Sequence, residues 1–416
     1  MAERSILAKG FRNVSYLTIG NVFASVINFI GFIYIARELG PGNYGIFVTL
    51  DSFVAFFQIL TLNNIAKVMI REGAKNPEKM GKLFEKTIGL KKVLALFSIL
   101  ICLIVTMFMP YPWLTKLLIG IFAFNLINYA FNNYFMSSFQ AKEKFQYMSA
   151  LTILSRFIYV IFGIAALLLG FGLIGFILFV LAANFISLYI RYRVSKKEIP
   201  FRFKVGPYYD KKIIKASLIF SLIVFLGFFA SSRIDILMLS FLRSEADTGI
   251  YGLAVRLTDP FYNVKNLIIL GLFPTIVKIF HSKKVKSSKL WITSLIIGVI
   301  MFSGGILGYF ITPYAIPFFW PDYADSVPIF QVLIFVICLS FMEIPFTNIL
   351  AATNNEKSLL KITWITPVMN IPLNLLFLSW FGMIGIAYST VVVHIVRFFI
   401  FFLTSQKVLK KQGRIF

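Results

Sequence analysis

The stretch Ser231–Pro260, SSRIDILMLSFLRSEADTGIYGLAVRLTDP, sets four charges into otherwise apolar sequence. These charges are Arg233, Asp235, Arg256 and Asp259. An ionised side chain at bilayer depth costs ~2.5–3.5 kcal/mol on insertion scales, so four such side chains require partners or water. Read as two spanning helices joined by an outer loop, the stretch brings both charge pairs to a similar depth in the outer half of the membrane. The two pairs could therefore face each other.

The composition is that of a polytopic membrane protein. Of 416 residues, 59% are hydrophobic and 14% charged, whereas about a quarter of the residues in soluble domains are charged. The net charge of +24 comes from Lys and Arg between apolar runs, which we interpret as membrane topology and not as a nucleic-acid surface. Cys102 and Cys338 lie inside apolar runs, and His281 and His394 share no cluster with acids. We expect no disulfide, metal site, catalytic residue or cofactor beyond a coupling proton or Na⁺.

Apolar segments long enough to cross about 30 Å of hydrocarbon recur along the whole chain. The N-terminal one is long and leads into Arg37-Glu38 without a small-residue cleavage site, so we predict a first spanning helix and not a cleaved signal. Twelve segments are predicted: 14–36, 44–66, 90–110, 113–139, 148–169, 172–191, 213–242, 249–279, 290–311, 327–351, 359–380 and 383–405.

The distribution of basic residues gives the orientation. With a cytoplasmic N-terminus, nearly all Lys and Arg fall in the termini and the inner loops, including the run Lys67–Lys92, and the outer loops hold only Arg37, Lys116 and Arg243. The positive-inside rule then places both termini in the cytoplasm of a multi-pass cell-membrane protein.

An internal repeat divides the chain into two halves. Phe171-Gly-Leu-Ile-Gly175 before the sixth segment recurs as Phe381-Gly-Met-Ile-Gly385 before the twelfth. We therefore predict an all-α membrane protein with about twelve transmembrane helices in two six-helix lobes, 1–200 and 201–416. Six helices per lobe imply a pseudo-two-fold along the membrane normal, with a site between the lobes.

Polar residues recur at helical spacing inside several apolar segments, so these helices turn one face away from lipid. Such stripes either form hydrogen bonds between helices or line a wet cavity. They are Thr18, Asn21, Ser25 and Asn28; Asp51, Gln58 and Thr61; Asn125, Asn128 and Asn132; Arg256, Asp259, Asn263 and Asn266; Thr363, Thr366, Asn370 and Asn374.

Three short motifs resemble the polysaccharide-transporter branch of the multidrug/oligosaccharidyl-lipid/polysaccharide (MOP) flippase superfamily, the O-antigen flippase-like proteins. They are Ile35–Gly45 (IARELGPGNYG), Arg233-Ile-Asp235, and Gly249–Ala254 (GIYGLA) leading to Arg256. The resemblance covers essentially the whole chain and implies the fold of the multidrug transporters of that superfamily. It also implies a flippase that carries a polyprenyl-diphosphate-linked oligosaccharide from the inner to the outer leaflet by alternating access. We expect this flippase to be monomeric.

The resemblance gives the charged residues candidate roles. Arginine suits a diphosphate because the guanidinium stays charged and binds phosphate oxygens at two points. We expect Arg233 and Arg256, aided by Arg37 and Arg397, to hold the diphosphate, while Asn21, Asn28 and Asn263 contact sugar hydroxyls. The candidates for ion coupling are Asp235, Asp259, Asp51 and Glu343, and Glu343 can equally be a hydrogen-bonded structural acid.

Two other functions fit part of the pattern. A cation-coupled exporter of small drugs, from the same superfamily, would be favoured if acids outnumbered arginines among the intramembrane charges, and here they balance. A membrane glycosyltransferase or polymerase would need acids for a metal or a general base. The predicted outer loops are short, and their few acids form no paired motif.

Overall fold

The computed structural model describes residues 2–76, 78, 80–199, 201, 214, 217–218, 221, 225, 227–229, 231–281, 287–353 and 356–411. Within these residues the chain is helical throughout and contains no strand. By length and composition, nine of the described helical stretches can cross a membrane. The predicted all-α membrane fold is confirmed, and the exact count of twelve helices stays a prediction.

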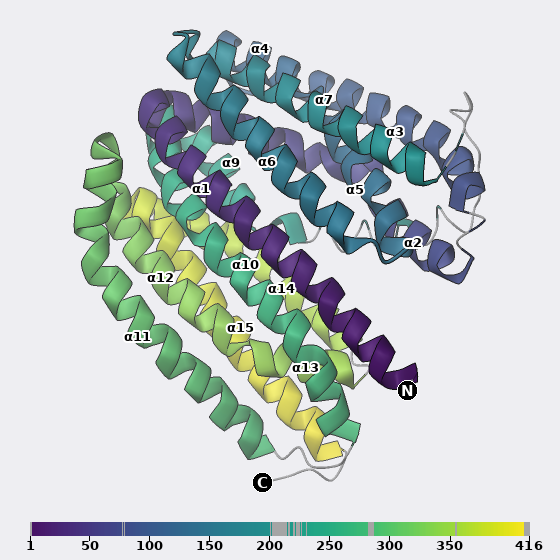
Figure 1. Ribbon diagram of the computed structural model, residues 1–416. Coiled ribbons are helices and arrows are strands. Elements are labelled where there is room, and N and C mark those ends of the chain that lie inside the picture. The colour runs from purple at the N-terminus through teal and green to yellow at the C-terminus, as the bar shows by residue number, and fades with distance from the viewer. Residues whose placement is uncertain are drawn as a thin grey trace. The chain divides into compact units, whose positions relative to one another are not determined.

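Apolar sequence forms most of the helices of the first part of the chain (Figure 1). These elements are α1 (Ala2–Phe57), η1 (Gln58–Thr61), α2 (Ile65–Lys75), α3 (Met80–Phe108), α4 (Trp113–Phe122), α5 (Asn125–Ala141), α6 (Phe145–Leu168) and α7 (Gly172–Glu198).

The second part continues in the same way, although most of the predicted segment 213–242 before Ser231 lies outside the described residues. Its elements are α9 (Ser232–Leu242), α10 (Glu245–His281), α11 (Ser287–Phe319), η3 (Pro321–Tyr323), α12 (Ser326–Met342), α13 (Ile344–Ala352), α14 (Glu356–Phe381) and α15 (Met383–Lys411).

The chain separates into two compact units. One comprises Met1–Leu39 and Ile46–Phe225, and the other comprises Gly40–Gly45 and Leu226–Phe416. The predicted lobe boundary at residue 200, and the predicted symmetry between lobes, stay predictions.

The first unit packs α5 against α2, α3 and α7. Its core is rich in aromatic rings: Phe84 lies 4.7 Å from Tyr134 and 4.9 Å from Phe201, measured between ring centroids. The hydroxyl of Tyr134 donates to the carbonyl of Phe84 at 2.9 Å. A buried tyrosine hydroxyl needs such a partner, so the aromatic core also fixes the rotation of α5 against α3.

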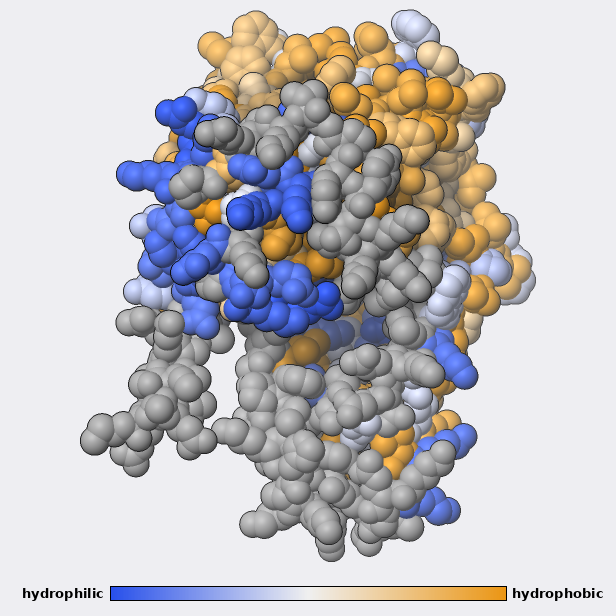
Figure 2. Space-filling model, turned by 90° about the vertical axis from the view of Figure 1, so that its right-hand side faces the viewer, coloured by the Kyte–Doolittle hydropathy of each residue, from blue (hydrophilic) through white to orange (hydrophobic). Residues whose placement is uncertain are grey.

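The second unit places α12 against α10, α11 and α15, and α14 beside α15; α11, α12 and α15 run side by side in Figure 1. Along α11, Val299, Leu307 and Phe310 are each about two-thirds exposed (67%, 66% and 67%). Exposed apolar side chains along a membrane-length helix are suited to lipid. Figure 2 shows a broad apolar expanse on one face of the molecule and hydrophilic side chains gathered in a patch beside it.

Several predicted spans are interrupted helices. The span 44–66 leaves α-helical geometry after Phe57, passes through η1, and turns at Leu62, which has a φ of 47°. The span 113–139 consists of α4 and α5. In the span 327–351, Pro345 has no N–H to donate to the carbonyl of Phe341, and α12 gives way to α13 there.

The repeated glycines have the same backbone geometry in each unit. Gly172, at the start of α7, has a φ of 56°, and Gly382, just before α15, has a φ of 66°. Residues with a side chain rarely adopt such angles, whereas glycine does so at little cost. The repeat in the sequence therefore reflects a repeated turn before the last helix of each half.

The segment Gly40–Gly45 joins the second unit through a close backbone contact. Gly40 leaves helical geometry (φ 68°, ψ 168°) ahead of Pro41. A Cβ on Gly45 would collide with the backbone carbonyl of Glu245, and one on Gly249 with the carbonyl of Pro41. Glycine at both positions therefore lets this segment lie directly against the start of α10.

Candidate functional site

Asp235 is the centre of a buried polar cluster in the second unit. Its side chain is 2% exposed and accepts hydrogen bonds from Asn370 Nδ2 (3.0 Å), Asn374 Nδ2 (2.7 Å) and the Tyr251 hydroxyl (3.3 Å). The hydroxyl of Ser389 donates to Asn374 Oδ1, which directs the amide N–H groups of Asn374 toward the carboxylate. Four helices, α9, α10, α14 and α15, thus converge on one acid.

The local sequence explains this convergence. Asp235 lies in the first turn of α9, where the positive end of the helix dipole stabilises a negatively charged carboxylate. Asn370 and Asn374 are one turn apart on α14, so both amides project from one face. The described partners of Asp235 are all neutral donors, and its carboxylate forms no salt bridge with a described residue.

Glu343 is the centre of a second buried cluster, and its surroundings are cationic. It is 1% exposed, and its carboxylate oxygens accept hydrogen bonds from Arg397 Nε (3.0 Å) and Nη2 (2.5 Å). Lys265 Nζ lies 3.8 Å from one oxygen and His394 Nδ1 lies 3.6 Å from the other. The two-point bond from Arg397 makes this a tightly coupled ion pair between α15 and the junction of α12 and α13.

The polar stripe predicted on α10, which begins with Arg256 and Asp259, is more exposed than the clusters around Asp235 and Glu343. Arg256 Nη1 lies 3.0 Å from Asp259 Oδ2, with the two side chains 38% and 49% exposed. This is a local i, i+3 ion pair within one helix, the alternative to the interpretation that both side chains line a cavity. Asn263 is exposed and Arg233 is half-buried. The structure brings Arg256 and Asp259 together, while Asp235 lies in its own cluster.

The candidates on α1 occupy different environments within the first unit. Arg37 and Asn21 are exposed, and Asn28 is half-buried. Asp51 is half-buried and accepts a hydrogen bond of 2.7 Å from the Tyr129 hydroxyl on α5. Their proposed roles stay predictions.

Lys91 is the buried charge that the sequence analysis placed in a basic inner loop. It lies inside α3 with 0% exposure, and its Nζ donates to the Thr61 carbonyl at 2.6 Å and to Asn63 Oδ1 at 3.4 Å. It thereby supplies a donor where the second predicted span leaves helical geometry. Thr87, Lys91 and Ser98 fall on one helical face in the sequence, but this spacing does not distinguish a buried lysine from one in an inner loop.

Metal chemistry has no evident centre in the described part of the chain. No three His, Cys, Asp or Glu side chains come together there in a way that could hold a metal ion. Among the described acids, Asp235 is buried among neutral amide and hydroxyl groups, all of which donate to its carboxylate.

Solved structures with the same fold are membrane transporters. A multidrug resistance MATE family transporter of the MOP superfamily, in its inward-facing conformation, is 15% identical with a TM-score of 0.72 over 93% of this chain and 96% of that one. Lipid II flippase MurJ, in an inward closed conformation, is 15% identical with a TM-score of 0.71 over 96% and 87%. A MOP superfamily transporter from Pyrococcus furiosus is 14% identical with a TM-score of 0.62 over 96% and 95%.

The sequence itself is matched by one family profile. Among curated proteins, none matches this chain significantly. The profile described as "Polysaccharide biosynthesis protein" matches residues 11–280, which is more than half of the chain. The expected family is therefore confirmed: the chain belongs to the polysaccharide biosynthesis protein family and has the all-α membrane fold of MOP-superfamily transporters.

Proposed function

We propose that this protein is a flippase that moves a polyprenyl-diphosphate-linked oligosaccharide from the inner to the outer leaflet of the cell membrane by alternating access. The observation that supports it most is the match to a polysaccharide biosynthesis family on a chain whose described part consists of helices, nine of them of membrane-spanning length. Sugar hydroxyls and phosphates cannot cross hydrocarbon without polar partners. A polytopic protein of a polysaccharide biosynthesis family can provide such partners and carry sugars and phosphates across the membrane.

The diphosphate is proposed to bind Arg256 and Arg233. The pair of Arg256 with Asp259 is well exposed on both sides, so it contributes little stability and can exchange its acid for a phosphate. Arg397 is held at two points by the buried Glu343. We therefore leave Arg397 out of the proposed phosphate-binding set and treat it as a structural cation.

Asp235 is the proposed coupling acid. Of the four candidate acids, Glu343 and Asp259 are paired with arginines, and Asp51 is only half-buried. Asp235 is buried among neutral donors, so binding or release of a proton or Na⁺ would change its charge without competing with a resident cation. Because α9, α10, α14 and α15 meet at Asp235, such a change of charge would alter how these four helices pack together.

The test is flipping of a fluorescent polyprenyl-diphosphate sugar in proteoliposomes, with the acceptor leaflet read by a membrane-impermeant quencher. We expect Arg256→Ala and Arg233→Ala to reduce the flipping rate at least tenfold, while Arg243→Ala, a cation at the end of α9 outside the proposed site, retains the rate. Full activity in both arginine variants would remove the diphosphate site. Failure of the unaltered protein to flip the lipid would remove the proposed function.

A further inference from the structure

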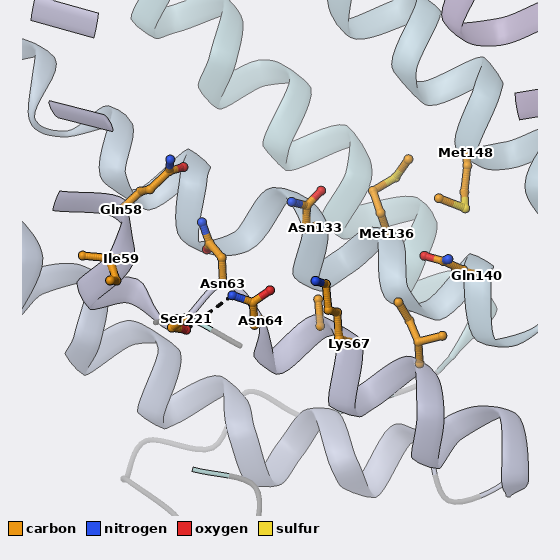
Figure 3. A pocket seen from close by; sticks show the side chains of 12 residues that line it. Gln58, Ile59, Asn63, Asn64, Lys67, Asn133, Met136, Gln140, Met148 and Ser221 are labelled. Atoms are coloured by element: carbon orange, nitrogen blue, oxygen red, sulfur yellow. Dashed lines mark hydrogen bonds between the residues drawn. The ribbon is translucent and has the colours of Figure 1, made fainter. Parts of the chain in front are cut away.

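A pocket of about 310 Å³ with polar and apolar lining residues lies in the first unit, where η1 and α2 meet α5. Ligand pockets occupy ~300–1,000 Å³, so this volume suits one sugar residue and not a chain of them. Figure 3 shows the side chains of η1, α2 and α5 around this space. The residues that line it are Gln58, Ile59, Asn63, Asn64, Ala66, Lys67, Ile70, Asn133, Met136, Gln140, Met148 and Ser221.

The interruption between η1 and α2 creates one wall of the pocket. The turn at Leu62 brings Asn63 and Asn64 to the lining, and the Lys91 ammonium secures this turn through the Thr61 carbonyl. A continuous helix would carry Asn63 and Asn64 on different faces, about 100° apart. The buried lysine therefore maintains a polar wall that helical geometry alone would not build.

Asn63 is oriented by its neighbours. Its Oδ1 accepts from the Thr61 hydroxyl at 2.8 Å and from Lys91 Nζ at 3.4 Å. An ammonium can only donate, so the end of the amide that faces Lys91 is the carbonyl oxygen, and its amide N–H groups are free of these contacts. Asn64 in turn donates to the Ser221 hydroxyl at 3.4 Å (Figure 3).

Three further carboxamides line the pocket without an internal hydrogen bond. In the described part of the chain, the side chains of Gln58, Asn133 and Gln140 bond to no other protein group. Asn133 and Gln140 are two turns apart on one face of α5, with Met136 between them. A carboxamide offers a donor and an acceptor at once, which matches a sugar hydroxyl that also does both.

The remaining lining chemistry agrees with a sugar. Met136, Met148 and Ile59 give apolar surface for the C–H face of a pyranose ring. Lys67 is the single charged residue among the described lining residues. The pocket thus combines amides for hydroxyls with thioethers for ring carbons.

We propose that this pocket is a monosaccharide subsite, in which the carboxamides of η1, of the turn before α2 and of α5 bind the hydroxyl or acetamido groups of one sugar of the lipid-linked glycan. The inference rests on the proposed flippase function and deepens it, because it locates sugar recognition in the first unit alone. The specificity for the glycan then comes from amide contacts, whereas arginine contacts with the diphosphate are common to every sugar.

The experiment uses two lipids that differ only in the sugar: a polyprenyl diphosphate carrying one N-acetylhexosamine, and the same polyprenyl diphosphate without it. The full chain is purified into nanodiscs without sugar-headed detergents, because their glucose rings would compete for the pocket. Native mass spectrometry titrates each lipid into the unaltered protein, the double variant Asn133→Ala/Gln140→Ala and the control Gln146→Ala. Gln146 is an exposed amide on α6 outside the pocket.

The double variant is expected to bind the glycosylated lipid about tenfold more weakly or worse, because two hydrogen bonds are lost, and to bind the unglycosylated lipid as the unaltered protein does. Thermal stability should stay unchanged, since both amides are exposed. Equal affinities for the glycosylated lipid, or an equal loss for both lipids, would overturn the subsite while leaving the flippase proposal standing. If the unaltered protein binds neither lipid, the proposed function fails, and the subsite fails with it.

Discussion

Removal of one partner from the buried ion pair of Glu343 and Arg397 should destabilise the second unit strongly. Glu343→Gln would keep the shape of the side chain and remove its charge. Arg397 and Lys265, 19% and 12% exposed, would then remain as buried cations without their acid. Removing one partner of a buried pair costs ~3–5 kcal/mol, because the other charge stays desolvated.

The magnitude can be compared with an exposed pair in the same unit. Arg256 and Asp259 have a similar separation of 3.0 Å but side chains that are 38% and 49% exposed, so breaking that pair should cost only ~0–1 kcal/mol. At ~2–4 °C per kcal/mol for units of this size, we expect Glu343→Gln to lower the melting temperature by ~6–20 °C, and Asp259→Asn to lower it by less than ~4 °C.

The two buried cysteines can report the thermal unfolding of the two units. Cys338 is a buried free thiol on α12 in the second unit, and Cys102 is its counterpart on α3 in the first. In a Cys102→Ala background, a thiol-reactive dye reports exposure of Cys338 as the temperature rises. The double variant Glu343→Gln/Arg397→Gln should be less destabilised than the sum of the two single variants, because it leaves fewer unpaired charges.

Two results would refute this reasoning. Equal shifts of the melting temperature in Glu343→Gln and Asp259→Asn would mean that burial does not determine how much stability is lost when an ion pair is broken. If the double variant showed simple additivity, the two side chains would not be coupled, despite the two hydrogen bonds between them.

Three further predictions follow from contacts in the two units. Asp235→Asn should keep the protein folded and abolish the dependence of flipping on an imposed proton or Na⁺ gradient; a gradient response equal to that of the unaltered protein would contradict the coupling role. Lys91→Met should lower the melting temperature reported by Cys102 in a Cys338→Ala background, since it leaves the Thr61 carbonyl without its buried donor at a cost of ~1–3 kcal/mol; an unchanged melting temperature would mean that the helix interruption does not need the ammonium. Gly45→Ala should reduce the yield of folded protein because its Cβ meets backbone, whereas Gly42→Ala, which meets open space, should not; gel filtration of both variants checks this, and equal yields would refute the close approach.

Local periodicity was sufficient to predict the apolar spans and the polar face of α14. Asn370 and Asn374 fall one turn apart in the sequence, and in the structure both bind Asp235. The partner itself was not predictable, because it lies more than 130 residues away and is brought in by packing. The same holds for Arg397 and Glu343, which were assigned separate roles and form one ion pair.

The interruption after Phe57 was also beyond sequence reasoning. The run Gln58–Asn64 contains neither glycine nor proline, so no local signal marks a break. The ammonium of Lys91 comes from another helix and accounts for the free carbonyl at Thr61. A lysine next to a second lysine at the start of an apolar run resembles a loop residue, and only tertiary structure shows that it is buried.

The segment Gly40–Gly45 has a consequence for how the chain can be divided. It belongs to the second unit, although the residues before and after it belong to the first. A fragment that starts at residue 226 would therefore lack six residues of its own packing, and Gly249 would expose bare backbone where Pro41 normally lies. If the gene is split between the units, the C-terminal half should be stable only when the N-terminal half is co-expressed, because the N-terminal half carries the segment Gly40–Gly45.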